Sequence, residues 1–65
     1  MITTTRAQRE SLLRIWQRIN DARRPSQTTL PYRQFRKTVA PGPDCLMVPF
    51  AGMWLGIERD GYTHS

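Results

Sequence analysis

The feature that most constrains this chain is an uncharged run of thirteen residues from Cys45 to Ile57. The run holds Phe50 and Trp54 together with Leu, Met, Val and Ile, whereas the rest of the chain is mainly polar or basic. A chain of 65 residues forms one domain, and a domain of this size buries only about 60% of the surface that its unfolded chain exposes. We therefore expect the other segments to pack onto this run.

Neither a disulfide bond nor a structural metal ion is expected to stabilise that core. Cys45 is the only cysteine, so an internal disulfide is excluded, and His64 is the only histidine. A structural zinc site usually takes four Cys or His ligands in characteristic spacings. The sequence thus predicts no metal and no cofactor, and self-association is one remaining way to add stability.

The amino-terminal residues lack the apolar segment of a signal peptide. The run at 45–57 is shorter than the roughly 20 residues of a membrane span, and Pro49 and Gly52 interrupt it. A free cysteine fits a reducing compartment. These observations predict a cytoplasmic protein that does not contact a membrane.

Two helices are predicted in the first forty residues. Thr5 and Gln8 form a capping-box pattern at the start of a helix over 6–22. Its buried stripe is spaced at i, i+3, i+4 and i+7, and comprises Leu12, Ile15, Trp16 and Ile19. Pro25 ends it, and 23–29 form a polar connector. A short helix follows over 30–39, capped by Thr29, with Tyr32, Phe35 and Val39 on one side.

The last third of the chain is predicted to be a sheet. The prolines and glycine of 40–43 favour neither helix nor strand. Strands over 45–50 and 53–58 are joined by the two-residue loop Ala51-Gly52, and Asp60-Gly61 predicts a type I′ turn into a third strand over 62–64. The expected fold is α+β, in which one long and one short helix cover one face of a three-stranded antiparallel meander.

The period of two in the second strand predicts two different faces. Met53, Leu55 and Ile57 share one face, while Trp54 lies on the other beside Gly56, which leaves room for a neighbouring ring. Two positions of Trp54 remain open. A small domain favours a core position against Trp16 and Phe35, whereas a position on the uncovered face makes Trp54 and Tyr62 a protein interface.

Charge is distributed unevenly along the chain. Residues 1–40 hold nine basic and two acidic residues, a net charge of +7, whereas 41–65 have a net charge of −2. Nine of the ten basic residues are Arg, whose planar guanidinium suits phosphate and carboxylate recognition. This asymmetry predicts a nucleic acid or an acidic protein surface as partner, although a solvated helical face is the alternative.

If nucleic acid is the partner, the contacts are expected without base-specific readout and with a steep dependence on salt. Tyr32, Phe35 and Tyr62 are the candidates for base stacking. The predicted nucleic-acid-binding residues are Arg14, Arg18, Arg23, Arg24, Arg33, Arg36 and Lys37.

Catalytic residues are not predicted. Cys45 and His64 are the nearest approach to a nucleophile and base, but we expect the central strand to separate them. Asp44 and Asp60 adjoin turn residues, where Asp commonly stabilises the turn. The glycines are not spaced for a phosphate-binding loop. We therefore expect a binding protein and not an enzyme.

Residues 30–39 and 45–65 resemble small hypothetical proteins encoded by tailed bacteriophages, most clearly in Gly52-Met-Trp-Leu-Gly-Ile-Glu-Arg-Asp-Gly-Tyr-Thr-His-Ser65. The resemblance does not extend to the amino-terminal helix and carries no functional residues. It implies a phage accessory protein in the host cytoplasm. With the charge pattern it favours a nucleic-acid-binding module; the alternatives are a protein that modulates a host enzyme through Trp54 and Tyr62, or a self-associating virion or assembly component.

Overall fold

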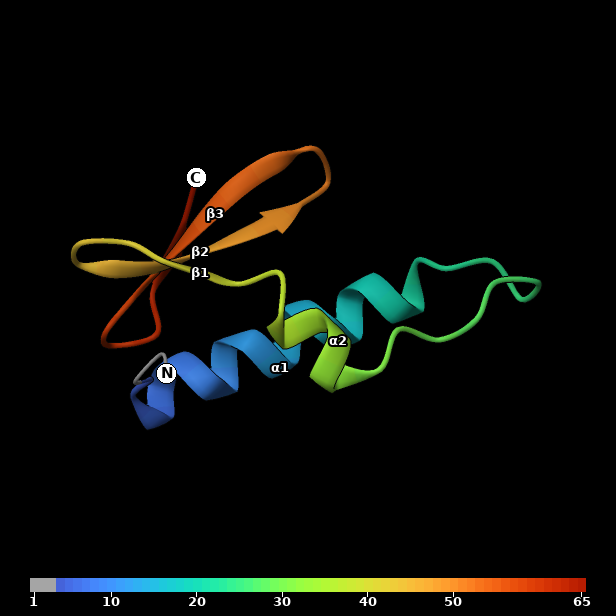
Figure 1. Cartoon of the computed structure of the whole chain (residues 1–65), viewed down its shortest axis with the longest axis horizontal. Helices are drawn as coiled ribbons and strands as arrows, with labels where there is room; N and C mark the ends of the chain where they lie inside the picture. The colour runs from blue at the N-terminus through green and yellow to red at the C-terminus, as the bar shows by residue number, and fades with distance from the viewer. Residues whose placement is uncertain (1–3) are drawn as a thin grey trace.

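The computed structural model describes residues 4–65 and has an α+β fold. A layer of two helices lies against one side of an antiparallel sheet (Figure 1). The elements in chain order are α1 (Arg6–Asp21), α2 (Tyr32–Arg36), β1 (Ala40–Pro41), β2 (Cys45–Phe50), β3 (Met53–Glu58) and β4 (Thr63–His64).

The predicted long helix is confirmed as α1. Thr5 is its N-cap, and the capping box is complete because Gln8 N donates to Thr5 Oγ1 at 3.1 Å and Thr5 N donates to Gln8 Oε1 at 3.0 Å. The helix ends at Asp21, one residue before the predicted end, and Ala22 is its C-cap.

The second helix is shorter than predicted and begins later. The expected cap at Thr29 is wrong, since Pro31 is the N-cap of α2 and makes no side-chain capping bond. Leu30 is held by α1 instead: its carbonyl oxygen accepts from Trp16 Nε1 at 2.7 Å, and its N–H donates to Asn20 Oδ1 at 2.7 Å. These bonds from α1 hold the backbone of Leu30 outside the helix.

The sheet has four strands in the order β1-β2-β3-β4, one more than the predicted meander. The expectation that 40–43 avoid strand structure is wrong, because Ala40 pairs with Met47 and Pro41 with Leu46. A proline is tolerated in an edge strand, where its missing N–H can face away from the partner. The final strand is also shorter than predicted, covering Thr63–His64.

Of the two predicted turns, one is confirmed. Ala51 (φ 52°) and Gly52 (φ 79°) both have positive φ, as a type I′ hairpin loop requires. The predicted type I′ turn at Asp60-Gly61 is wrong, since of the two only Gly61 has positive φ. Gly61 N instead donates to Glu58 O, and Glu58 N donates to Tyr62 O, each at 2.8 Å. This pattern is a three-residue loop with its glycine in the left-handed position.

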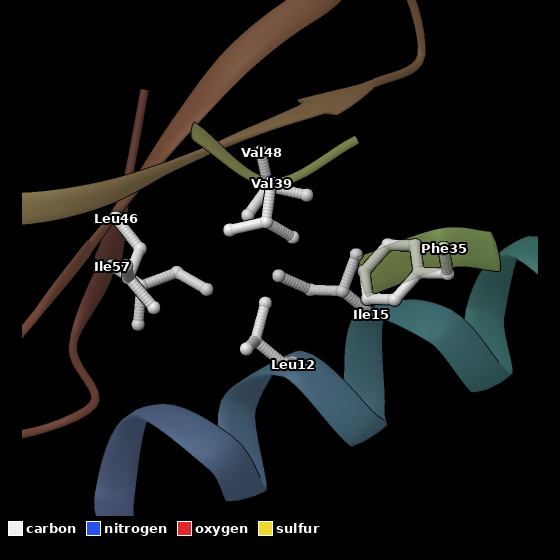
Figure 2. Packing of buried hydrophobic residues seen from close by; sticks show 7 residues of the cluster. All are labelled: Leu12, Ile15, Phe35, Val39, Leu46, Val48 and Ile57. Carbon is white, nitrogen blue, oxygen red and sulfur yellow. The ribbon is translucent and has the colours of Figure 1, made fainter. Parts of the chain in front are cut away.

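The hydrophobic core lies between α1, α2 and the inner face of the sheet. Figure 2 shows its seven buried side chains pointing toward one another from these elements and from the segment between α2 and β1: Leu12, Ile15, Phe35, Val39, Leu46, Val48 and Ile57. Trp16 and Ile19 pack against this cluster. The prediction that the helices cover one face of the sheet, through Leu12, Trp16, Ile19, Phe35 and Val39, is confirmed, and the covered face is the one that carries Ile57.

A core position for Trp54 is wrong. Its residue surface is 54% exposed, and the strand period turns it to the face opposite that of buried Ile57. Its cross-strand partner is Pro49, which is also exposed. The helices cover only one face of this sheet, so Trp54 lies on the other, which we call the outer face.

Candidate functional site

The charge asymmetry of the sequence becomes an asymmetry in space. The connections β1–β2 and β3–β4, which contain Asp44 and Asp60, lie toward the left end of the molecule in Figure 1. The end of α1 and the 23–31 connector lie toward the other end and α2 lies nearer the middle, and most of the predicted nucleic-acid-binding residues belong to these segments. The molecule is elongated, with extents of 37 × 22 × 16 Å. Because Arg6 and Arg9 begin α1, Arg59 lies in the β3–β4 connection and Asp21 ends α1, the asymmetry along the axis is one of net charge.

None of the seven predicted nucleic-acid-binding residues forms an ion pair within residues 4–65. The two ion pairs in that range are Arg6–Glu10 at 3.4 Å and His64–Glu58 at 3.0 Å. Arg24, Arg33 and Lys37 are also exposed to solvent, and Arg36 is half-buried. These cations are therefore not neutralised by carboxylates of the described chain.

The seven residues do not share one surface. At 100° per residue, Arg14 and Arg18 each lie about 160° around the axis of α1 from Trp16. Trp16 faces the α2 side, since its ring contacts Tyr32 edge-on with centroids 5.4 Å apart. Arg14 and Arg18 consequently occupy the flank of α1 away from α2. The structure separates them from the group on the connector and α2, which we call the basic end: Arg24, Arg33, Arg36 and Lys37.

Arg23 has a structural role in the connector. Its Nη1 donates to the carbonyl oxygen of Thr28 at 2.8 Å, which closes the loop, and its Nε is buried without a hydrogen-bond partner among the described residues. Arg14 is also engaged, since its Nη2 donates to Ser11 Oγ at 3.0 Å.

None of the three rings predicted to stack on bases is freely exposed at the basic end. Phe35 is 1% exposed and belongs to the core. Tyr32 is half-buried between Trp16 and Phe35. Tyr62 is 66% exposed but lies beside β4. Contacts of the basic end are therefore limited mainly to those of charged side chains.

The outer face carries the second predicted site. Its hairpin end exposes Trp54, whereas the neighbouring Met53, which is 49% exposed, belongs to the opposite face with Phe50. Residues 49–54 line a hollow at this end. Tyr62 lies elsewhere, stacked on His64 with ring centroids 6.2 Å apart and planes 23° from parallel. Trp54 and Tyr62 therefore flank opposite ends of β3 and do not form one cluster.

A third group on the outer face was not predicted as a site. Donor atoms of Cys45 on β2, Glu58 on β3 and His64 on β4 all lie within 4.8 Å of one another. Cys45 pairs with Glu58 across β2 and β3, and His64 pairs with Gly56 across β3 and β4. The expectation that the central strand separates Cys45 from His64 is wrong.

Gly56 explains why those two residues meet. A Cβ atom at this position would lie 2.8 Å from His64 Cε1 and 3.3 Å from Cys45 Sγ. The central strand has no side chain between them, so the imidazole occupies the space that Gly56 leaves. The sequence predicted that Gly56 admits a neighbouring ring, and this is confirmed. Sequence reasoning missed the contact between His64 and Cys45 because the pairing of β4, which places His64 opposite Gly56, could not be deduced from the sequence.

No protein-family model, curated protein or solved structure matches this chain. Within residues 4–65, neither helix is long and apolar enough to cross a membrane.

Proposed function

We propose that this protein binds nucleic acid through backbone contacts, mainly at the basic end. The observation that carries the proposal is that Arg24, Arg33, Arg36 and Lys37 form no ion pair within the described chain. The connections that contain Asp44 and Asp60 lie toward the other end of the long axis (Figure 1). A cationic end of this kind orients a small protein toward a polyanion.

The contacts are to phosphates and not to base edges. The helix at the basic end spans only Tyr32–Arg36, which is short for reading a major groove. The aromatic rings near it are buried or half-buried, so base stacking contributes little. Affinity should therefore fall steeply with salt and vary little with sequence. A phage accessory role is part of this proposal, so phage and bacterial DNA are the first ligands to test.

The test compares two triple variants that remove the same charge. Arg24→Gln/Arg33→Gln/Lys37→Gln changes exposed residues at the basic end, and Arg6→Gln/Arg9→Gln/Arg59→Gln changes exposed residues elsewhere. Binding of labelled single- and double-stranded DNA is measured by fluorescence anisotropy over a range of salt concentrations. The basic-end variant should reduce the slope of log K against log salt by about 1 per lost phosphate contact, and the control should reduce it much less. Equal effects of both variants, or no binding at low salt, would contradict the proposal.

A second candidate is a protein interface at the hairpin end. Trp54 is 54% exposed beside exposed Met53, and exposed Trp residues are frequent anchors of interfaces. The partner is then a host enzyme or a second copy of this chain. Sedimentation of the wild type and Trp54→Ala tests self-association directly, because a dimer that the variant dissociates identifies the second copy. If the wild type is monomeric and captures a bacterial protein that Trp54→Ala does not capture, a host partner is favoured.

A further inference from the structure

Three neighbouring strands each contribute one metal-ligand side chain to the outer face. Cys45 and Glu58 are direct cross-strand partners, and His64 is the diagonal neighbour of Glu58 on the next strand. Such diagonal neighbours are within reach of long side chains. All three are accessible from solvent, since Cys45 and Glu58 are half-buried and His64 is exposed.

The donor atoms already converge. His64 Nε2 lies 3.0 Å from Glu58 Oε2, and the donor atoms of all three residues lie within 4.8 Å of one another. Bonds of 2.0–2.3 Å in a tetrahedral zinc site place the donors about 3.4 Å apart. Rotation about side-chain bonds can bring the donor atoms from their present separations to this distance, and the paired strands need not move.

The donor types select the ion. A thiolate and an imidazole are ligands that Zn²⁺ favours, and a carboxylate completes sets found around zinc. Mg²⁺ and Ca²⁺ are disfavoured because they take oxygen donors. Three protein ligands leave the fourth tetrahedral position for water or for a group of a partner. We propose that Cys45, Glu58 and His64 form a solvent-accessible binding site for Zn²⁺.

Two further features support a built site. Gly56 provides the space in which the imidazole and the thiol approach, since a Cβ there would lie 2.9 Å from His64 Nε2. The ring of Tyr62 stacks on His64, which restricts the orientation of the imidazole. A bound ion would tie β2, β3 and β4 together, and β4 has only two residues in the sheet. Metal ions commonly supply this kind of support in small domains.

The first experiment uses untagged, metal-free protein in a non-chelating reductant. Co²⁺ serves as a spectroscopic substitute for zinc, and Zn²⁺ is titrated by calorimetry. We expect one ion per chain, a thiolate-to-cobalt charge-transfer absorption with tetrahedral visible bands, and loss of these bands when Zn²⁺ displaces the cobalt. The melting temperature should rise with Zn²⁺.

Variants then identify the ligands. Cys45→Ser, Glu58→Gln and His64→Asn should each weaken Zn²⁺ binding at least about tenfold, and Cys45→Ser should abolish the charge-transfer band. Asp44→Asn is the matched control for Glu58→Gln, because it removes a nearby exposed carboxylate outside the cluster and should leave affinity unchanged. Circular dichroism without metal verifies that each variant folds.

Gly56→Ala supplies a test that keeps all three ligands. The added methyl group displaces the exposed His64 ring and should lower affinity about tenfold, an effect typical of altered ligand orientation. Met47 Sδ lies 3.7 Å from Cys45 Sγ, and Met47→Leu should leave Zn²⁺ affinity unchanged. Four results would each overturn the proposal. They are a site selective for Cu⁺ that needs Met47, a stoichiometry of one ion per two chains, absence of the thiolate-to-cobalt band, and unchanged Zn²⁺ affinity in the ligand variants.

Discussion

Gly61 packs directly against Ala7 in the first turn of α1. A Cβ atom added to Gly61 would lie 2.9 Å from the carbonyl oxygen of Ala7 and 3.1 Å from its Cβ. Gly61 also has φ +91°, in the left-handed region that favours glycine. Both the loop geometry and the packing of the β3–β4 loop on α1 therefore require glycine here.

Gly61→Ala is expected to destabilise the protein more than Gly52→Ala. Both glycines have positive φ, but a Cβ at Gly52 would meet nothing within 4 Å. Gly52→Ala should cost about 1 kcal/mol for the left-handed backbone, and Gly61→Ala about 2–4 kcal/mol because overpacking against α1 is added. Urea unfolding of the two variants measures the difference. Equal costs would show that α1 does not confine the loop.

Ala51→Asn is expected to stabilise the β2–β3 hairpin. Ala51 is an exposed, non-glycine residue at φ 52°, and Asn tolerates the left-handed region better than Ala. The free energy of unfolding should rise by about 0.5–1 kcal/mol, which corresponds to an increase in Tm of several degrees in a domain of this size. Ala51→Val, which is β-branched, should lower Tm in the same thermal melts. A fall in Tm for Ala51→Asn would contradict the type I′ geometry.

Gln8 links α1 to the sheet through its buried side chain. It is 4% exposed, and its Nε2 donates to the carbonyl oxygen of Ile57 at 3.1 Å. Gln8→Ala removes two hydrogen bonds of this buried side chain, the one that Gln8 Oε1 accepts from Thr5 N in the capping box and the one to Ile57, so we expect a loss of about 2 kcal/mol. Gln17→Ala on the exposed side of α1 is the control and should change stability by about 0.5 kcal/mol or less. Comparable losses would exclude a special role for Gln8.

Truncation of the two large aromatic residues Trp54 and Phe35 should lower stability by very different amounts. Phe35 is 1% exposed in the core, so Phe35→Ala should cost about 3–5 kcal/mol. Trp54 is 54% exposed, and Trp54→Ala should cost about 1 kcal/mol or less. Chemical denaturation of the monomer distinguishes them. A large loss for Trp54→Ala would place its ring in the stabilising core and weaken the case for an interface there.

Features that depend on neighbouring residues were predictable. The capping box at Thr5 and Gln8, the stripe of α1 and the Ala51-Gly52 hairpin are each encoded within a few residues. The helical side of the core followed as well, because the period of 3.6 in α1 selects the residues of one buried stripe. The α+β class follows from these local patterns.

Features that depend on distant contacts were not predictable. Trp16 and Asn20 hold the backbone of Leu30 and so decide where α2 begins. Pairing with β2 makes Ala40 and Pro41 a strand, although their local sequence disfavours one. In both cases a tertiary hydrogen bond outweighs a weak local preference.

The run from Cys45 to Ile57 shows the same division within one segment. Its sequence determined that it forms a hairpin with two unlike faces, because alternation and the Ala-Gly loop are local properties. Only the tertiary structure decided that Trp54 faces outward, since the helices cover the face of Ile57 alone. The pairing of β4 likewise brings His64 over Gly56 to Cys45 and Glu58. Strand register is set by long-range pairing, which no local pattern in 45–57 contains.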